Sequence, residues 1–273
     1  MTAIEETFQK LRKRKEAALI GYVTAGDPEP EYTPKIAEAL IKGGVDILEL
    51  GLPFSDPIAD GPTIQAASLR ALKAGTKPKT VLGLAKEIRS KHNLPIVVMT
   101  YYNPIFRMGL ESFFRFARDC LVDGVIIPDL PVEEAGAYKK VALLNGVDTI
   151  FLVAPSTSVV RLRKIVAETS GFLYVVSHFW VTGSKGSIED STIQLVKRIL
   201  PFTKGKVPLA VGFGVSNPGQ VKQLVEAGVD GVIVGSAFVN IVSKNQTNLQ
   251  NMLSELEFTA RSLKAATNKF GSL

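Results

Sequence analysis

The segment "VPLAVGFGVSNPGQVKQLVEAGVDGVIVGSA", residues 207–237, contains one complete unit of the pattern that decides the fold. Two short apolar runs, "VPLAVGFG" and "DGVIVGSA", flank the amphipathic segment "NPGQVKQLVEAG". A run that is apolar throughout is typical of a strand covered on both faces, and the order strand, helix, strand is typical of parallel pairing. The segment therefore predicts two parallel strands joined by a helix.

Six further runs of this kind lie upstream, so that the chain has eight: "AALIGYVTAG", "VDILELG", "PIVVMTYYN", "GVIIPDLP", "DTIFLVAP", "FLYVVSHF" and the two above. Helical stretches separate them, such as "SLRALKAG", which predicts a helix over 68–75. The tripeptide Gly-Val-Asp recurs at 44–46, 146–148 and 228–230, where its glycine would end a helix before a strand. Eight such units predict an α/β fold, a single-domain (β/α)8 TIM barrel; an open doubly wound sheet is the alternative.

The two ends of the chain carry separate expectations. The opening "MTAIEETFQKLRKRKEA" has acidic residues and lacks the apolar core of a secretory signal, so it predicts an N-terminal capping helix and a cytoplasmic protein. We expect one domain over 1–270. The last three residues, 271–273, "GSL", resemble a cloning remnant.

Composition excludes several classes of protein. With 46% hydrophobic and 21% charged residues the chain is globular, and no apolar run reaches the length of a membrane helix. Cys120 is the only cysteine, which excludes an internal disulfide and a cysteine-based metal site. The net charge of +6 is scattered apart from "LRKRK" at 11–15, so we expect a small anionic ligand rather than nucleic acid.

In a barrel of this kind the working face lies at the carboxyl ends of the strands. The side chains expected there are Tyr22, Glu49, Asp60, Tyr101, Asn103, Asp129, Tyr174 and Thr182. The loops after the seventh and eighth strands commonly hold phosphate, and Gly212, Gly214 and Gly235 would let backbone N–H groups approach it, with the Ser236 hydroxyl at a helix start. Plain turns are the alternative interpretation of these glycines.

The stretch "LELGLPFSDPIADGP", residues 48–62, places carboxylates on a strand and on the loop that follows. If Glu49 points into the barrel mouth, desolvation raises its pKa toward neutrality, as an acid/base requires. Asp60 would then take an orienting role, because its environment differs. The alternative is a partly exposed strand carboxylate and an Asp retained for the turn, which is our interpretation of Asp56.

The chain resembles the α-subunit of tryptophan synthase over nearly its whole length. The resemblance rests on "LELGLPFSDPIADGPTIQ", "GYVTAGDP", "MTYYNPI", "IIPDLP", "VTG", "GFGVSNP" and "DGVIVGSA". It implies a lyase that cleaves indole-3-glycerol phosphate to indole and glyceraldehyde 3-phosphate by a retro-aldol reaction, with no cofactor and no metal. It also implies a heterotetramer, α2β2, with a β-subunit that "PFSDPIADGP" and "YYNPI" would contact.

The same resemblance assigns roles to residues. Glu49 would be the acid/base, and Asp60 would hold the indole N–H and stabilise developing positive charge. Further matches are Tyr174 beside the Glu, Tyr101 beside the substrate, Thr182, which would bond the Asp on loop closure, and the phosphate contacts Gly183, Gly214, Gly235 and Ser236. We also assign Tyr22 to the substrate site; core packing is the alternative for each tyrosine.

One loop departs from the family pattern. In "SHFWVTGSKGSI" His178 and Trp180 stand where the family usually has Arg and Gly. A Trp in a lid that must fold over substrate adds bulk, so we expect slower turnover than for Trp180→Gly. This departure gives one alternative to the lyase, a catalytically weak subunit that mainly activates the β-subunit. A separate alternative is another phosphosugar lyase or isomerase on the same scaffold, which the Asp60 loop disfavours.

Overall fold

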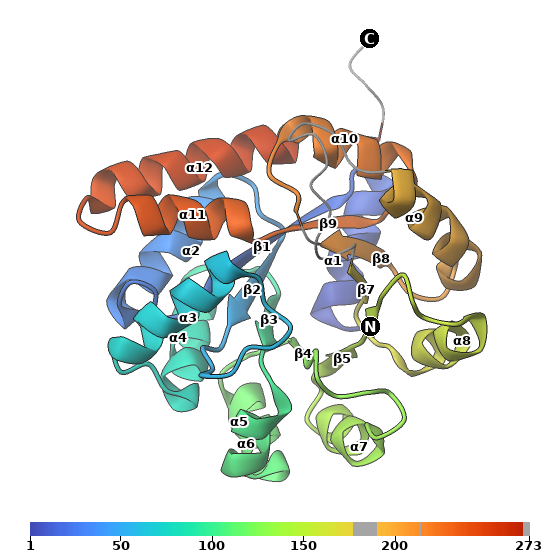
Figure 1. The fold of residues 1–273 in the computed structure, drawn as a ribbon, viewed down its shortest axis with the longest axis horizontal. Helices are drawn as coiled ribbons and strands as arrows, with labels where there is room; N and C mark the ends of the chain where they lie inside the picture. The colour runs from blue at the N-terminus through green and yellow to red at the C-terminus, as the bar shows by residue number, and fades with distance from the viewer. Residues whose placement is uncertain (177–189, 213, 270–273) are drawn as a thin grey trace.

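The computed structural model describes residues 1–176, 190–212 and 214–269, and its strands form one parallel sheet that closes into a barrel (Figure 1). Nine strands lie within the described residues, in the spatial order β5-β4-β3-β2-β1-β9-β8-β7-β6. Their bounds are β1 Ala18–Thr24, β2 Ile47–Gly51, β3 Ile96–Met99, β4 Gly124–Ile126, β5 Asp148–Ile150, β6 Leu152–Val153, β7 Leu173–Val176, β8 Leu209–Gly212 and β9 Gly231–Val234.

The barrel closes within one stretch of chain. The run at 148–155, predicted as a single strand, is divided at Phe151: β5 pairs with β4 on one side, and β6 pairs with β7 on the other. Because β5 and β6 are separated by one residue, the two ends of the sheet are joined covalently. The predicted barrel is confirmed, and the open doubly wound sheet is wrong.

Helices surround the strands on the outside (Figure 1). Their bounds are α1 Ala3–Lys13, α2 Thr33–Lys42, α3 Pro62–Lys73, α4 Pro78–Lys91, α5 Tyr102–Met108, α6 Leu110–Asp119, α7 Gly136–Leu144, α8 Val159–Glu168, α9 Asp190–Thr203, α10 Pro218–Glu226, α11 Ser236–Lys244 and α12 Leu249–Ala265, with a 3-10 turn at Pro30–Tyr32. The helix predicted over 68–75 begins six residues earlier, because Gly61 is extended and Pro62 fits the first helical turn. The expected cloning remnant at 271–273 lies outside the described residues.

Side chains of the strands alternate between two apolar layers. Ile47 belongs to a cluster inside the barrel, whereas Leu48 and Leu50 belong to the larger cluster between strands and helices. Glu49 therefore points inward, two residues after Ile47. On the amino-terminal side, α1 contributes Ile4, Phe8 and Leu11 to the inner cluster, which confirms the predicted capping helix.

The glycine and the aspartate of the recurring Gly-Val-Asp each have a structural role. Gly44 and Gly228 adopt positive φ angles of 98° and 100° at helix ends, a region that glycine enters without strain. In two of the three copies the aspartate accepts a backbone N–H of the preceding strand: Asp46 from Leu19 at 2.8 Å, and Asp230 from Leu209 at 3.0 Å. These bonds fix neighbouring strands at their amino ends, opposite the expected working face.

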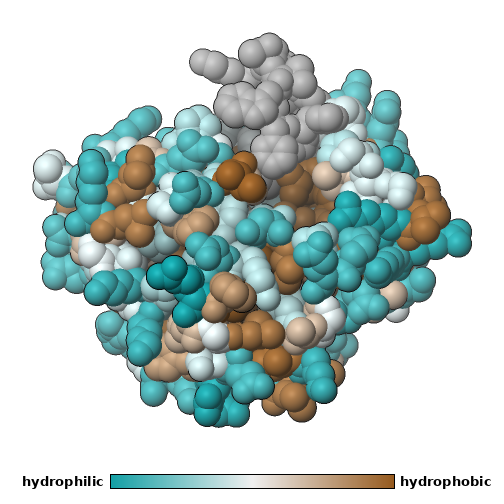
Figure 2. Space-filling model, turned by 60° about the horizontal axis from the view of Figure 1, so that its bottom comes forward, coloured by the Kyte–Doolittle hydropathy of each residue, from teal (hydrophilic) through white to brown (hydrophobic). Residues whose placement is uncertain are grey.

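In a space-filling view, apolar and polar side chains are interspersed on the face toward the viewer (Figure 2). Cys120 is buried, as expected for a small apolar side chain. Within the described ranges, no helix has both the length and the apolar character that crossing a bilayer would require.

Candidate active site

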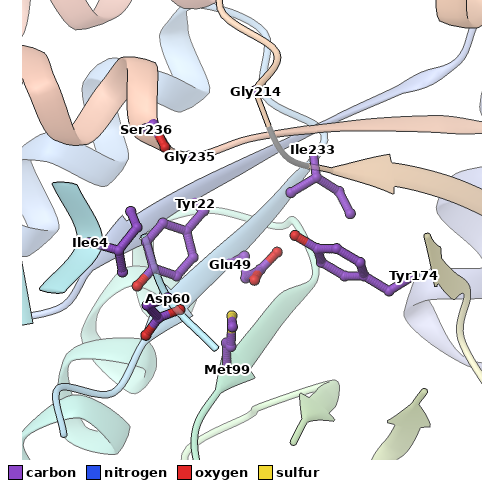
Figure 3. A pocket seen from close by; sticks show the side chains of 10 residues that line it. All are labelled: Tyr22, Glu49, Asp60, Ile64, Met99, Tyr174, Gly214, Ile233, Gly235 and Ser236. Carbon is purple, nitrogen blue, oxygen red and sulfur yellow. The ribbon is translucent and has the colours of Figure 1, made fainter. Parts of the chain in front are cut away.

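A pocket opens at the carboxyl ends of the strands and gathers residues from seven separate parts of the chain (Figure 3). Its lining is Tyr22, Glu49, Asp60, Ile64, Met99, Tyr174, Gly214, Ile233, Gly235 and Ser236. Seven of these ten were predicted as site residues from the sequence. The remaining three, Ile64, Met99 and Ile233, are apolar, and a sequence gives no signal that separates such residues from the core.

Glu49 is fully buried on β2 and faces the pocket (Figure 3). Among the described residues, neither of its carboxylate oxygens has a hydrogen-bond partner. Burial, and secondarily the nearby charge of Asp60, raises the pKa of Glu49 to about 8. The side chain is therefore largely protonated at neutral pH and can both donate and accept a proton there.

Asp60 stands across the pocket from Glu49, on the loop between β2 and α3 (Figure 3). Burial raises its pKa to about 6, while a hydrogen bond from the Tyr101 hydroxyl acts in the opposite direction. The Tyr101 hydroxyl also accepts the Ala59 N–H at 2.9 Å, and Gln65 donates to the Asp60 carbonyl at 2.8 Å. Asp60 is thus mostly ionised at neutral pH, and its loop is held from two sides.

Tyr22 approaches Glu49 from the neighbouring strand β1, and Tyr174 approaches it from β7, which is not adjacent to β2 (Figure 3). Tyr22 is the register partner of Glu49 on β1, and its hydroxyl lies 3.2 Å from the Thr24 hydroxyl. A Cβ on Gly51 would stand 2.1 Å from the Tyr22 hydroxyl, and one on Gly212 would stand 2.4 Å from that of Tyr174. Both glycines leave room for a tyrosine, a role that the sequence indicated for neither: Gly212 was expected to approach a phosphate, and it does not line this pocket.

The far side of the pocket can receive an anion. Gly214, with φ of 75°, Gly235 and Ser236 line it, and Ser236 begins α11 (Figure 3). Free N–H groups at a helix start attract phosphate. The other predicted contacts, Thr182 and Gly183, lie outside the described residues, as do His178 and Trp180.

Three expected residues lie elsewhere on this face. Tyr101 is buried behind Asp60 rather than lining the pocket, and it stacks on Phe54 with ring centroids 5.3 Å apart. Asn103 and Asp129 line a separate depression, where the Asp129 carboxylate accepts the Tyr102 N–H at 2.9 Å. Across residues 1–176, 190–212 and 214–269, no group of three His, Cys, Asp or Glu side chains is arranged to hold a metal ion.

Comparisons with known proteins agree with this geometry. Residues 8–268 match the family model "Tryptophan synthase alpha chain". The chain is 48% identical to the tryptophan synthase alpha chain of Methanosarcina acetivorans, over 96% of this chain and 93% of that one. It is 42% identical to the Arabidopsis thaliana protein of the same name, over 96% and 94%.

Solved structures give the same result. The alpha chain from Legionella pneumophila superposes with a TM-score of 0.91 at 34% identity, covering all of both chains. A chain of the tryptophan synthase a2b2 complex from Pyrococcus furiosus does so with a TM-score of 0.86 at 40% identity, covering 91% of this chain and 98% of that one. The chain belongs to the tryptophan synthase alpha chain family.

Proposed function

We propose that this chain cleaves indole-3-glycerol phosphate to indole and glyceraldehyde 3-phosphate by a retro-aldol reaction, as a step of tryptophan biosynthesis. The observation that carries the proposal is Glu49, which is buried at the pocket with both carboxylate oxygens unpartnered among the described residues. A buried carboxyl group without internal partners is costly, so a substrate that supplies those partners accounts for it.

The reaction requires two proton transfers. Indole becomes a leaving group when its C3 gains a proton, which the protonated Glu49 donates. The glycerol hydroxyl next to the scissile bond then loses its proton to the Glu49 carboxylate, the carbon–carbon bond breaks, and its electron pair returns to the indole ring. One carboxyl group with a pKa of about 8 can perform both transfers in turn. Both steps use protein side chains, so the proposal includes no cofactor.

Asp60 and the pocket's far side hold the two ends of the substrate. The Asp60 carboxylate accepts the indole N–H and stabilises the positive charge that develops when C3 is protonated. Tyr22 and Tyr174 line the pocket around the ring, and Tyr101 acts through its hydrogen bond to Asp60. The start of α11, with Gly214, Gly235 and Ser236, receives the phosphate. Thr182 and Gly183 complete this assignment from the sequence motif.

An assay of indole release tests the proposal. The purified parent protein should release indole from indole-3-glycerol phosphate, and Glu49→Gln, which cannot transfer a proton, should lose roughly a hundredfold or more in kcat. Asp60→Asn should be slowed as well, since it lacks the charge. A silent parent, or a Gln variant with full rate, would contradict the proposal.

We propose that the chain works with a tryptophan synthase β-subunit as α2β2, in the cytoplasm. Loop 53–62 and the segment 101–105 form the expected contact face. Ile58 is 83% exposed beside Asp60, and Phe106 is 68% exposed on α5, which suits an apolar partner surface. Mixing with a purified β-subunit should give a complex of heterotetramer mass, and Ile58→Asp with Phe106→Asp should weaken it.

The alternative of a catalytically weak subunit rests on His178 and Trp180, in the segment of the sequence that follows β7. Indole release measured with and without the β-subunit separates the two functions. A weak subunit would raise the β-subunit's turnover while releasing little indole itself under either condition, whereas the lyase releases indole in both.

A further inference from the structure

We propose that the ion pair between Asp27 and Arg70 is a positioning device of the active site: it fixes α3, and with it the loop that carries Asp60, against the end of β1. The inference rests on the proposed function, because it concerns where Asp60 stands relative to Glu49. Neither Asp27 nor Arg70 lines the pocket, so both would act through other residues.

The pair makes a bidentate contact, with two nitrogen atoms of Arg70 bound to the two carboxylate oxygens of Asp27. Arg70 Nε lies 2.7 Å from Asp27 Oδ1, and Arg70 Nη2 lies 2.8 Å from Oδ2. The Asp27 side chain is 2% exposed and that of Arg70 is 22% exposed. A two-point contact between a guanidinium and a buried carboxylate restricts both distance and angle, which a lysine or a surface pair does not.

One route leads from Arg70 to Asp60 along α3. The helix begins at Pro62, two residues after Asp60, and carries Ile64 into the pocket and Ala67 into the inner apolar cluster. Gln65, on the same helix, donates to the Asp60 carbonyl. A helix of this length moves as a rigid rod, so a contact that fixes its last turns also limits the movement of Asp60.

A second route leads from Asp27 to Tyr22 through the turn after β1. The Asp27 N–H donates to the Thr24 carbonyl at 3.3 Å, and the Thr24 hydroxyl meets that of Tyr22. The turn itself has little freedom: Gly26 donates to the Thr33 hydroxyl at 2.8 Å, and a Cβ on Gly26 would stand 2.0 Å from the Thr76 hydroxyl. The ion pair therefore ties α3 to a turn that is itself fixed.

The test must separate positioning from mere stability. We choose the double variant Asp27→Asn with Arg70→Met, which removes both charges and leaves no lone buried charge to unfold the protein. Its kcat for indole release should fall about tenfold to a hundredfold, while KM should change less, because Asp60 acts on charge that develops in the transition state. Arg70→Lys keeps the charge without the two-point contact, so its kcat should lie between that of the double variant and that of the parent.

A second readout does not depend on activity. The Asp60 carboxyl can be titrated by NMR; the titratable groups that face it are Glu49, Tyr22, Tyr101 and Tyr174. In the double variant its titration midpoint should move from about 6 toward the ordinary range for Asp, as the loop leaves its buried position. If the parent released no indole, the proposed function would fail, and this titration would still decide the positioning role.

The control is the pair Arg89 and Asp123, which is also largely buried, at 17% and 14% exposure, but has a longer N···O distance of 3.7 Å. It lies where β3 and β4 begin, and Asp123 accepts the Ile96 N–H there. Arg89→Met with Asp123→Asn should lower the melting temperature and leave both kcat and the Asp60 titration as in the parent. The inference is wrong if Asp27→Asn with Arg70→Met behaves like this control.

Discussion

Glu49 and Asp60 have pKa values on either side of neutrality, which gives the pH dependence of the reaction a definite sign. Glu49 must be protonated to donate its proton to indole C3, so kcat/KM should fall as pH rises through about 8. Asp60 must be ionised, so kcat/KM should fall as pH drops below about 6. A pH–rate profile with a plateau between these limits is the expected result, and a rate that still climbs above pH 9 would contradict it.

The two limbs of that profile are coupled, which allows each to be assigned. The Asp60 charge contributes to the raised pKa of Glu49, although burial contributes more. In Asp60→Asn the residual activity should therefore lose its acid limb, and its alkaline limb should move to lower pH while staying above the ordinary Glu range. An alkaline limb unchanged by this substitution would mean that another group is responsible for it.

Strands β1 and β2 lie side by side in the register that sets Tyr22 opposite Glu49, and Gly51 makes this pairing possible. A methyl group at position 51 would collide with the Tyr22 ring and hydroxyl, so Gly51→Ala should cost about 1–3 kcal/mol of stability and displace Tyr22 from the pocket. Thermal melts and kcat/KM should both fall for this variant.

A control and a rescue sharpen that prediction. Gly83→Ala on α4 has open space around its new methyl group and should be neutral or slightly stabilising. Adding Tyr22→Phe to Gly51→Ala removes the atom closest to the new Cβ and should recover part of the stability. Equal melting temperatures for Gly51→Ala and Gly83→Ala would show that the strands accommodate the methyl group.

The strands were predictable from the sequence, but the direction of their side chains was not. Each run is apolar on both faces, because helices cover it outside and other strands face it inside. The sequence "ILEL" therefore does not reveal which alternate side chains of the strand point into the barrel. The inward direction of Glu49, and the division of the fifth run at Phe151, follow from closure of the ring, which is a property of all the strands together. Closure could be inferred from the strand count, but its position could not.

For the same reason the site was only partly predictable. Glu49, Asp60 and the glycines stood out because each lies near the end of an apolar run or on the loop after it, at the side of the barrel where the carboxyl ends of the strands meet. Arg70 and Asp27 are 43 residues apart in the sequence, and no motif in either segment indicates that they form an ion pair. Contacts between side chains of different units depend on the three-dimensional packing of those units, and they were found only in the structure.

The active site also lowers the stability of the molecule as a whole, and this cost depends on pH. Glu49 has an ordinary pKa near 4.5 when the chain unfolds and about 8 when it is folded, so between these values the unfolded state ionises while the folded state does not. The destabilisation should grow by about 1.4 kcal/mol per pH unit over that window and stay constant above it. Glu49→Gln should therefore raise the melting temperature at pH 9 and change it little at pH 4.5. The control substitution Glu31→Gln, at an exposed position, should change the melting temperature little at either pH. A stabilisation by Glu49→Gln that is equal at both pH values would mean that packing, and not the buried ionisable group, sets the cost.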